Sequence, residues 1–152
     1  MNRFYFVAAA LALCVLVIGM VFAAARIDYF LDYPSLIMVV VPAAVLCLAA
    51  FPPRVIGRSF TVAFSRQTAS EQELRQAAVF FTSLQRCFLL SGAIGALIGI
   101  VTILAQLQEA AMAKLGQGFA LLLITVLYAL VLTLVLAVPF RAAVERRLAE
   151  KS

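Results

Sequence analysis

Four long stretches of this sequence contain no charged residue. They cover residues 4–25, 33–53, 87–108 and 115–140, which are 22, 21, 22 and 26 residues long. An α-helix needs about 20 mostly apolar residues to cross the roughly 30 Å hydrocarbon core of a bilayer. We therefore expect an all-α integral membrane protein with four transmembrane helices. The expected spans are residues 4–25, 34–53, 87–108 and 117–140.

The composition leaves no room for a second domain. Of the 152 residues, 66% are hydrophobic and 12% are charged, and the mean hydropathy is +1.11. Soluble domains are typically about 45–50% apolar and about 25% charged. We expect residues 1–152 to form one membrane domain, which excludes a separate catalytic domain of ordinary size.

The basic residues are distributed unevenly between the connecting segments. If the N-terminus is cytoplasmic, 10 of the 12 basic residues face the cytoplasm, and only Arg26 and Lys114 lie outside. Cytoplasmic loops carry such an excess of Lys and Arg, so we expect an N-in, C-in topology. Residues 54–86 are then a cytoplasmic segment and residues 141–152 a cytoplasmic tail. The net charge of +5 indicates orientation and contact with anionic lipid head groups, and not nucleic-acid binding.

The first stretch also has some features of a secretory signal. A basic N-terminal segment precedes an apolar run that ends in Ala23, Ala24 and Ala25, a small-residue pattern typical of cleavage sites. The apolar run is longer than the usual core of about 7–15 residues. Its removal would leave three spans and place the termini on opposite sides. We therefore favour an uncleaved first span.

Local signals predict a long helix and a kink. Ser70 and Glu73 form the S-x-x-E pattern of a capping box, and nothing after it breaks a helix before Gly92. We expect one helix from about residue 71 to 107, which extends from the cytoplasm into the third span. Pro42 lies in the middle of the second span, where proline removes a backbone hydrogen bond, so we expect a kink that serves either a gate or a static bend.

Helix packing is the default explanation for the small and polar residues inside the spans. Gly95 and Gly99, with Gly92 before them, give the small-xxx-small spacing that lets helix backbones approach closely. The few polar side chains include Thr102, Gln106, Thr125, Tyr128 and Thr133. Hydroxyl groups in membrane helices commonly bond to their own helix or to a neighbour.

The chain lacks the residues that several kinds of chemistry require. The chain has no histidine, no nucleophile beside a base and no phosphate loop, so we expect no enzyme, no cofactor and no metal site. The four uncharged stretches contain no titrating carboxylate, although proton and ion carriers commonly have one in the membrane. Either the chain moves no ions, or a partner supplies the titrating group.

Three segments resemble the MotA/TolQ/ExbB family in the same order. Residues 28–52 resemble its first outer loop and second span, with an aspartate, then Pro-Ser, an aliphatic run and a final Phe-Pro. Residues 92–100 resemble its Gly-rich third span, and residues 116–128 resemble the Gly-x-Gly start of its fourth. Pro139 lies where the family has a proline near the inner end of the fourth span.

The resemblance implies a division of labour between two proteins. Members form pentamers around single-span MotB/TolR/ExbD-like partner helices, which carry the essential aspartate for proton flow in the bacterial inner membrane. Spans three and four line the pore. The residues expected to line the pore or face the partner are Ala93, Ala96, Thr102, Thr125 and Tyr128, and Pro42 and Pro139 are the expected kink or gate positions.

The chain also departs from the family pattern. Residues 54–86 are too short for the large cytoplasmic domain, and the family's second span-four threonine is Val126 here. The third-span proline and threonine positions are Leu89 and Ala96, and the span-two glycines are Val41 and Pro42. These changes predict a drier pore. A non-conducting scaffold of the same architecture and a stand-alone four-span transporter or channel therefore remain as alternatives.

Overall fold

The computed structural model describes residues 3–24, 30–64, 69–105 and 112–151, and these residues are almost entirely helical. The helices are α1 (Arg3–Ala24), α2 (Tyr33–Ala50), α3 (Pro53–Phe64), α4 (Glu71–Ala105), α5 (Met112–Leu132) and α6 (Val138–Ala149), with a π-helical turn η2 (Thr133–Ala137) joining the last two. The expected all-α class is confirmed for this part of the chain.

Three helical segments are long and apolar enough to cross a membrane. They are Tyr33–Ala50, Glu71–Ala105 and Leu115–Ala149. The first expected span forms α1, in which the apolar stretch Val7–Gly19 is shorter. A span formed by the first stretch, and with it the total of four spans and the N-in, C-in topology, therefore stays a prediction.

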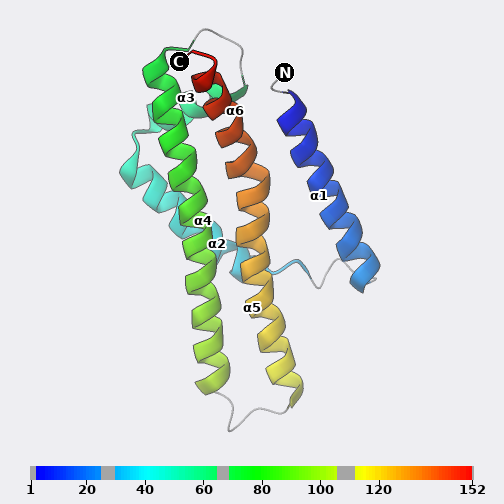
Figure 1. Ribbon diagram of the computed structural model, residues 1–152. Coiled ribbons are helices and arrows are strands. Elements are labelled where there is room, and N and C mark those ends of the chain that lie inside the picture. Colours follow the sequence, from blue (N-terminus) through cyan, green and yellow to red (C-terminus); the bar gives the residue numbers. More distant parts are fainter. Residues whose placement is uncertain (1–2, 25–29, 65–68, 106–111, 152) are drawn as a thin grey trace.

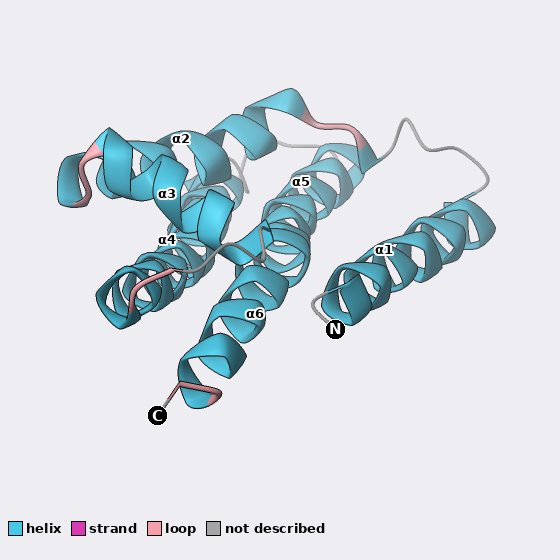
Figure 2. Cartoon of the chain, turned by 90° about the horizontal axis from the view of Figure 1, so that it is seen from above, coloured by secondary structure: helices cyan, strands magenta, loops and turns pink. Residues whose placement is uncertain are grey.

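A long antiparallel hairpin forms the centre of the molecule. Helix α4 runs beside α5, η2 and α6 along its whole length, and α2 and α3 pack on α4 (Figure 1). Helix α1 stands to one side, where it contacts α6 and η2 (Figure 2). The start of α2 lies beside the middle of α5, so the α4–α5 hairpin extends beyond it (Figure 1).

The predicted capping box is present at the start of α4. The backbone N–H of Glu73 donates to Ser70 Oγ at 3.2 Å, and the N–H of Ser70 donates to Glu73 Oε2 at 2.9 Å. Both contacts satisfy donors that a helix start leaves free. Helix α4 follows as one unbroken helix of 35 residues, close to the expected 71–107, and residues 106–107 lie outside the described residues.

Proline residues set the other helix boundaries. The second span was expected to continue to residue 53, but α2 ends at Ala50, and Phe51 is extended with φ −128° and ψ 131°. Phe51 precedes Pro52, and a residue before proline avoids the helical region. Pro53 then begins α3, where its missing N–H costs nothing. Pro42 lies within α2, which the structure describes as one helix, so its kink stays a prediction.

The last helical segment extends beyond the expected 117–140 because a wider turn accommodates Pro139. The N–H of Val138 donates to the carbonyl of Thr133, one residue farther back than in an α-helix. Proline has no N–H to continue the regular ladder, so a π-helical turn directly before it is a reasonable local solution. The hydroxyl of Thr133 is buried there and has no hydrogen-bond partner among the described residues.

Contacts between aromatic rings pack α3 against α4 and α6. Phe60 of α3 makes edge-to-face contacts with Phe80 and Phe81 of α4 and with Phe140 of α6, at centroid distances of 5.3–5.8 Å. Such pairs are favourable beyond the area they bury. The tail adds polar contacts, since Arg147 donates to the carbonyl of Val62 and Lys151 donates to that of Ala69.

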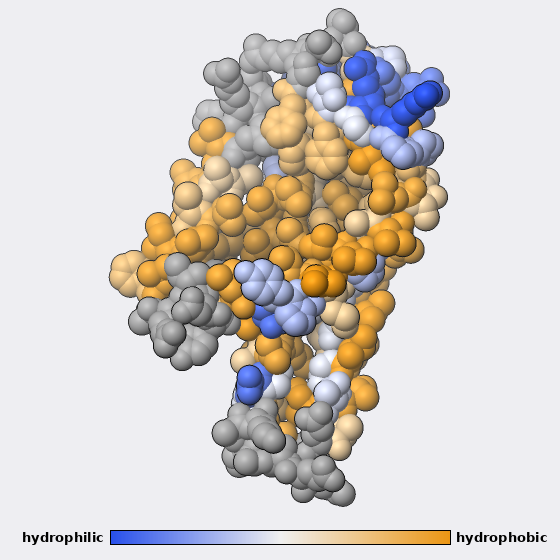
Figure 3. Space-filling model, turned by 180° about the vertical axis from the view of Figure 1, so that it is seen from behind, coloured by the Kyte–Doolittle hydropathy of each residue, from blue (hydrophilic) through white to orange (hydrophobic). Residues whose placement is uncertain are grey.

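The surface is apolar over most of its height. Figure 3 shows a broad hydrophobic face, and hydrophilic residues gather at the end of the molecule that holds the start of α4 and the end of α6. Large exposed apolar side chains occur along α1, α2, α4 and α5. A lipid environment accounts for this exposure, because apolar side chains lose nothing against lipid tails.

Candidate functional site

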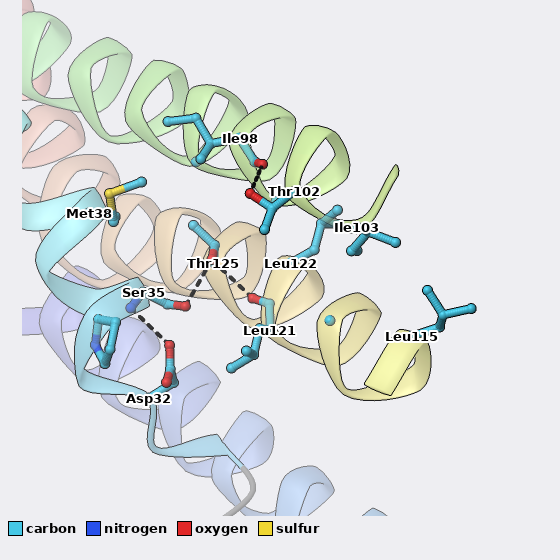
Figure 4. Close-up of a pocket in the computed structure, with 14 residues that line it drawn as sticks. Asp32, Ser35, Met38, Ile98, Thr102, Ile103, Leu115, Leu121, Leu122 and Thr125 are labelled. Atoms are coloured by element: carbon cyan, nitrogen blue, oxygen red, sulfur yellow. Dashed lines mark hydrogen bonds between the residues drawn. The ribbon is translucent and has the colours of Figure 1, made fainter. Parts of the chain in front are cut away.

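A pocket lies between the start of α2 and the facing sides of α4 and α5. Its volume is about 380 Å³. Most of its lining is apolar or glycine, and the polar lining residues are Asp32, Ser35, Thr102 and Thr125 (Figure 4). These four side chains come from three helical segments that are far apart in the sequence.

Three of the four polar lining residues, Asp32, Ser35 and Thr125, are linked by hydrogen bonds. The N–H of Ser35 donates to Asp32 Oδ2 at 2.9 Å, which caps the start of α2. Thr125 Oγ1 lies 3.0 Å from Ser35 Oγ and 3.0 Å from the carbonyl oxygen of Leu121. Since a hydroxyl has one hydrogen, Ser35 can donate to Thr125 while Thr125 donates to Leu121. Ser35 and Thr125 are each only 6% exposed, so this pair is buried inside the protein.

Tyr128 fixes the entry into α2 from the side of α5. Its hydroxyl donates to the carbonyl of Phe30 at 2.5 Å and accepts the N–H of Asp32 at 2.9 Å. Both partners precede α2, so one side chain satisfies two backbone groups there. Such groups are expensive to leave unpaired in an apolar environment. Tyr128 therefore positions Asp32 at the pocket.

Glycine residues let α4 and α5 approach closely at the pocket and next to it. A Cβ atom on Gly92 would lie 2.3 Å from Ala129 Cβ, and a Cβ on Gly95 would lie 2.7 Å from Thr125 Cγ2. Both distances are far below normal carbon–carbon contact. Gly118 of α5 lies equally close to α4, since a Cβ atom added to it would lie 2.8 Å from Ile103 Cγ1. Gly99 is looser, with Leu122 Cβ at 3.4 Å.

A comparison with protein families identifies the group to which this architecture belongs. The MotA/TolQ/ExbB proton channel family matches residues 56–152, which is more than half of the chain. The chain belongs to this family. The match includes α4, α5 and α6, and most of α3. A search of curated proteins found no match.

The family assignment confirms the resemblance from the sequence. Residues 92–100 and 116–128, on which the resemblance rested, lie inside the matched range. Residues 28–52 precede it, so their likeness to the MotA/TolQ/ExbB first outer loop and second span stays a prediction. A multi-pass protein embedded in a membrane is consistent with both the family and the three apolar helices.

The structure separates the residues that were expected to line the pore of this MotA/TolQ/ExbB protein. Thr102 and Thr125 both line the pocket, and the hydroxyl of Thr102 donates to the carbonyl of Ile98 at 2.9 Å. Ala93 is exposed and Ala96 is half-buried, and neither lines the pocket. Tyr128 lies one turn from Thr125 and does not line the pocket, but its hydroxyl accepts the N–H of Asp32, which does.

Three residues at this site were missed from the sequence. Ser35 lies at the start of the expected second span and Asp32 in the outer loop before it, and the sequence did not place either of them in a pocket with Thr125. The Asp-x-Pro-Ser pattern is nevertheless a typical helix start. Gly118 belongs to the Gly-x-Gly pattern at the start of residues 116–128, and nothing in the sequence placed it against Ile103 of α4. Within the described residues, no group of three or more His, Cys, Asp or Glu side chains lies close enough to hold a metal ion.

Proposed function

We propose that this protein is a subunit of a proton-conducting complex of the bacterial inner membrane. Several copies form a homo-oligomeric ring, a pentamer by resemblance, around the transmembrane helices of a single-span MotB/TolR/ExbD-like partner. The membership in the MotA/TolQ/ExbB proton channel family is the observation that carries the proposal. The proposed topology has four spans, with residues 54–86 and 141–152 in the cytoplasm.

The partner is proposed to supply the titrating group. The uncharged stretches of the sequence contain no Asp, Glu, Lys, Arg or His. The carboxylate nearest to them in the pocket, that of Asp32, already accepts the N–H of Ser35 and caps α2. Crossing a low-dielectric core needs such a group or a chain of water. An aspartate on the partner helix fits this need, as the family resemblance implies.

The outward side of α4 is the proposed contact with the partner or pore. Gly92, Gly95 and Ile103 of α4 are buried within the subunit, whereas Ala93, Leu97 and Leu104 are exposed. The methyl groups of Ala93 and Ala96 would allow another helix to approach closely. We propose that Thr102 and Thr125 provide the hydroxyl groups nearest to the proton path.

One observation favours a non-conducting scaffold as the second candidate. The hydroxyl of Thr125 is already hydrogen-bonded to Ser35 and to the carbonyl of Leu121, so it is not available to bind a proton carrier or a partner side chain. The family's span-three threonine is Ala96 in this chain. A ring with this lining would hold a partner helix by packing alone.

Proton flux distinguishes the two candidates. The complex would be purified with its partner and reconstituted into vesicles that contain a pH-sensitive dye. The channel proposal predicts that an imposed pH gradient collapses, and that replacing the partner's intramembrane aspartate by asparagine stops the collapse. A complex with its partner bound that leaves the gradient intact would favour the scaffold.

A further inference from the structure

A second, smaller pocket lies at the junction of α3 and α4. Its volume is about 180 Å³, and its lining includes Arg54, Arg58, Glu73 and Gln76. Helix α3 begins at Pro53, three residues after the end of the apolar helix α2. If α2 spans the bilayer, the pocket lies at the depth of the lipid head groups.

The pocket has unused hydrogen-bond donors. Arg58 donates through Nε to Glu73 Oε1 at 2.8 Å, and its two terminal amino groups have no partner among the described residues. Arg54 makes no hydrogen bond or ion pair with the described part of the chain. The two arginines are four residues apart on α3, so they project from the same face of the helix.

The charges of the pocket suit a monovalent anion. Two guanidinium groups and one carboxylate give a net charge of one positive unit. The contact with Glu73 already fixes the orientation of Arg58, which lowers the entropy lost on binding. Guanidinium groups match the geometry of phosphate oxygens with pairs of donors, and the positive end of the α3 dipole lies nearby.

We propose that this pocket binds the phosphate of an anionic phospholipid. A phosphodiester such as that of phosphatidylglycerol carries one negative charge and no neutralising amine, so it complements the pocket. The exposed apolar surface of α2, the helix that precedes the pocket in the chain, favours a lipid over free phosphate. Val41, Val45 and Leu48 of α2 are exposed apolar side chains on the helix that leads to the pocket, and acyl chains can pack along them.

The test measures lipid binding to the full-length complex by native mass spectrometry. Phosphatidylglycerol is titrated against phosphatidylcholine, which has the same phosphate with a neutralising cation. Arg54→Gln is the main variant, because Arg54 has no described contact whose loss would disturb the fold. Arg75→Gln is the matched control, since Arg75 lies on the first turns of α4 outside the pocket and pairs with Glu71 at 2.6 Å.

We expect Arg54→Gln to weaken phosphatidylglycerol binding about fivefold, which corresponds to one arginine near a lipid surface. Arg75→Gln and phosphatidylcholine binding should change less than about twofold. Equal phosphatidylglycerol affinity for the wild type and Arg54→Gln would overturn the proposal. If millimolar inorganic phosphate displaced the lipid as effectively as phosphatidylglycerol itself, the pocket would be a general anion site and the lipid assignment would be wrong.

Discussion

The contact between Gly92 and Ala129 gives the most direct test of how α4 and α5 pack. A Cβ atom on Gly92 would lie 2.3 Å from Ala129 Cβ. Carbon atoms in contact lie about 3.5–4.0 Å apart, so Gly92→Ala must push the helices apart locally by about 1.2–1.7 Å. Overpacking of this kind typically costs about 1–3 kcal/mol, and the better helix propensity of alanine returns up to about 1 kcal/mol.

We expect the single substitution Gly92→Ala to lower the free energy of unfolding by about 1–2 kcal/mol. Ala129→Gly should cost a similar amount, because it removes a buried methyl group and adds a flexible glycine. The double variant moves the methyl group from α5 to α4 and removes the clash. Its stability should therefore return to within about 0.5 kcal/mol of the wild type.

Unfolding in mixed micelles with increasing sodium dodecyl sulfate would measure all four proteins of this cycle. Gly116→Ala on α5 is the matched control, since no atom lies within 4 Å of its added Cβ, and it should not be destabilising. If the effects of Gly92→Ala and Ala129→Gly simply added, the two positions would not be in contact, and the described packing of α4 on α5 would be refuted.

Three further predictions concern the hydrogen bonds and ion pairs. Thr125→Val leaves the Ser35 hydroxyl on α2 without its partner, so it should lower the free energy of unfolding by about 1 kcal/mol. It should also reduce proton flux in vesicles while the complex stays assembled, and unchanged flux would remove Thr125 from the proton path. Tyr128→Phe loses two hydrogen bonds and should lower the melting temperature, whereas Tyr33→Phe at an exposed position should not; equal melting curves would contradict the role given to Tyr128. The hydrogen bond from Arg58 lowers the pKa of Glu73 below its ordinary value of 4.5, so this pair stabilises the fold fully above that value and loses its effect as the pH falls through the lowered pKa. The melting temperatures of the wild type and Arg58→Gln should accordingly converge in acid, and a difference that persisted at low pH would exclude this origin.

The sequence predicted individual helices where local signals are strong. The capping box at Ser70 and the uninterrupted helical pattern after it gave the start of α4 to the residue. The glycine spacing predicted close helix packing without naming the partner helix, and Gly92 and Gly95 lie where α4 approaches α5. The family assignment from short segments was correct, because those segments combine small residues with a fixed order along the chain.

Contacts between distant residues could not be predicted in the same way. Ser35 and Thr125 are 90 residues apart, and only the crossing of α2 over α5 brings their hydroxyl groups together. The same crossing places Asp32 beside Tyr128. The start and position of α3 could not be predicted either, because its first turn depends on Pro53 and its place in the bundle depends on the contacts of Phe60 with α4 and α6.

The continuation of the last helix through Pro139 had no clear local signal. Proline commonly ends or kinks a helix, and the end of the uncharged stretch at residue 140 suggested the end of the span. The structure instead widens one turn at Thr133–Ala137 and continues to Ala149. A π-helical turn depends on packing around the proline, so residue type alone did not reveal it.

The central claim is that this chain forms a ring around the membrane helices of a partner. Native mass spectrometry of the protein, extracted mildly from its own membrane, tests that claim most directly. The account predicts five copies of this chain bound to two copies of a small single-span protein, with an aspartate in the membrane segment of that protein. A monomer, a dimer or a ring without a partner would contradict it.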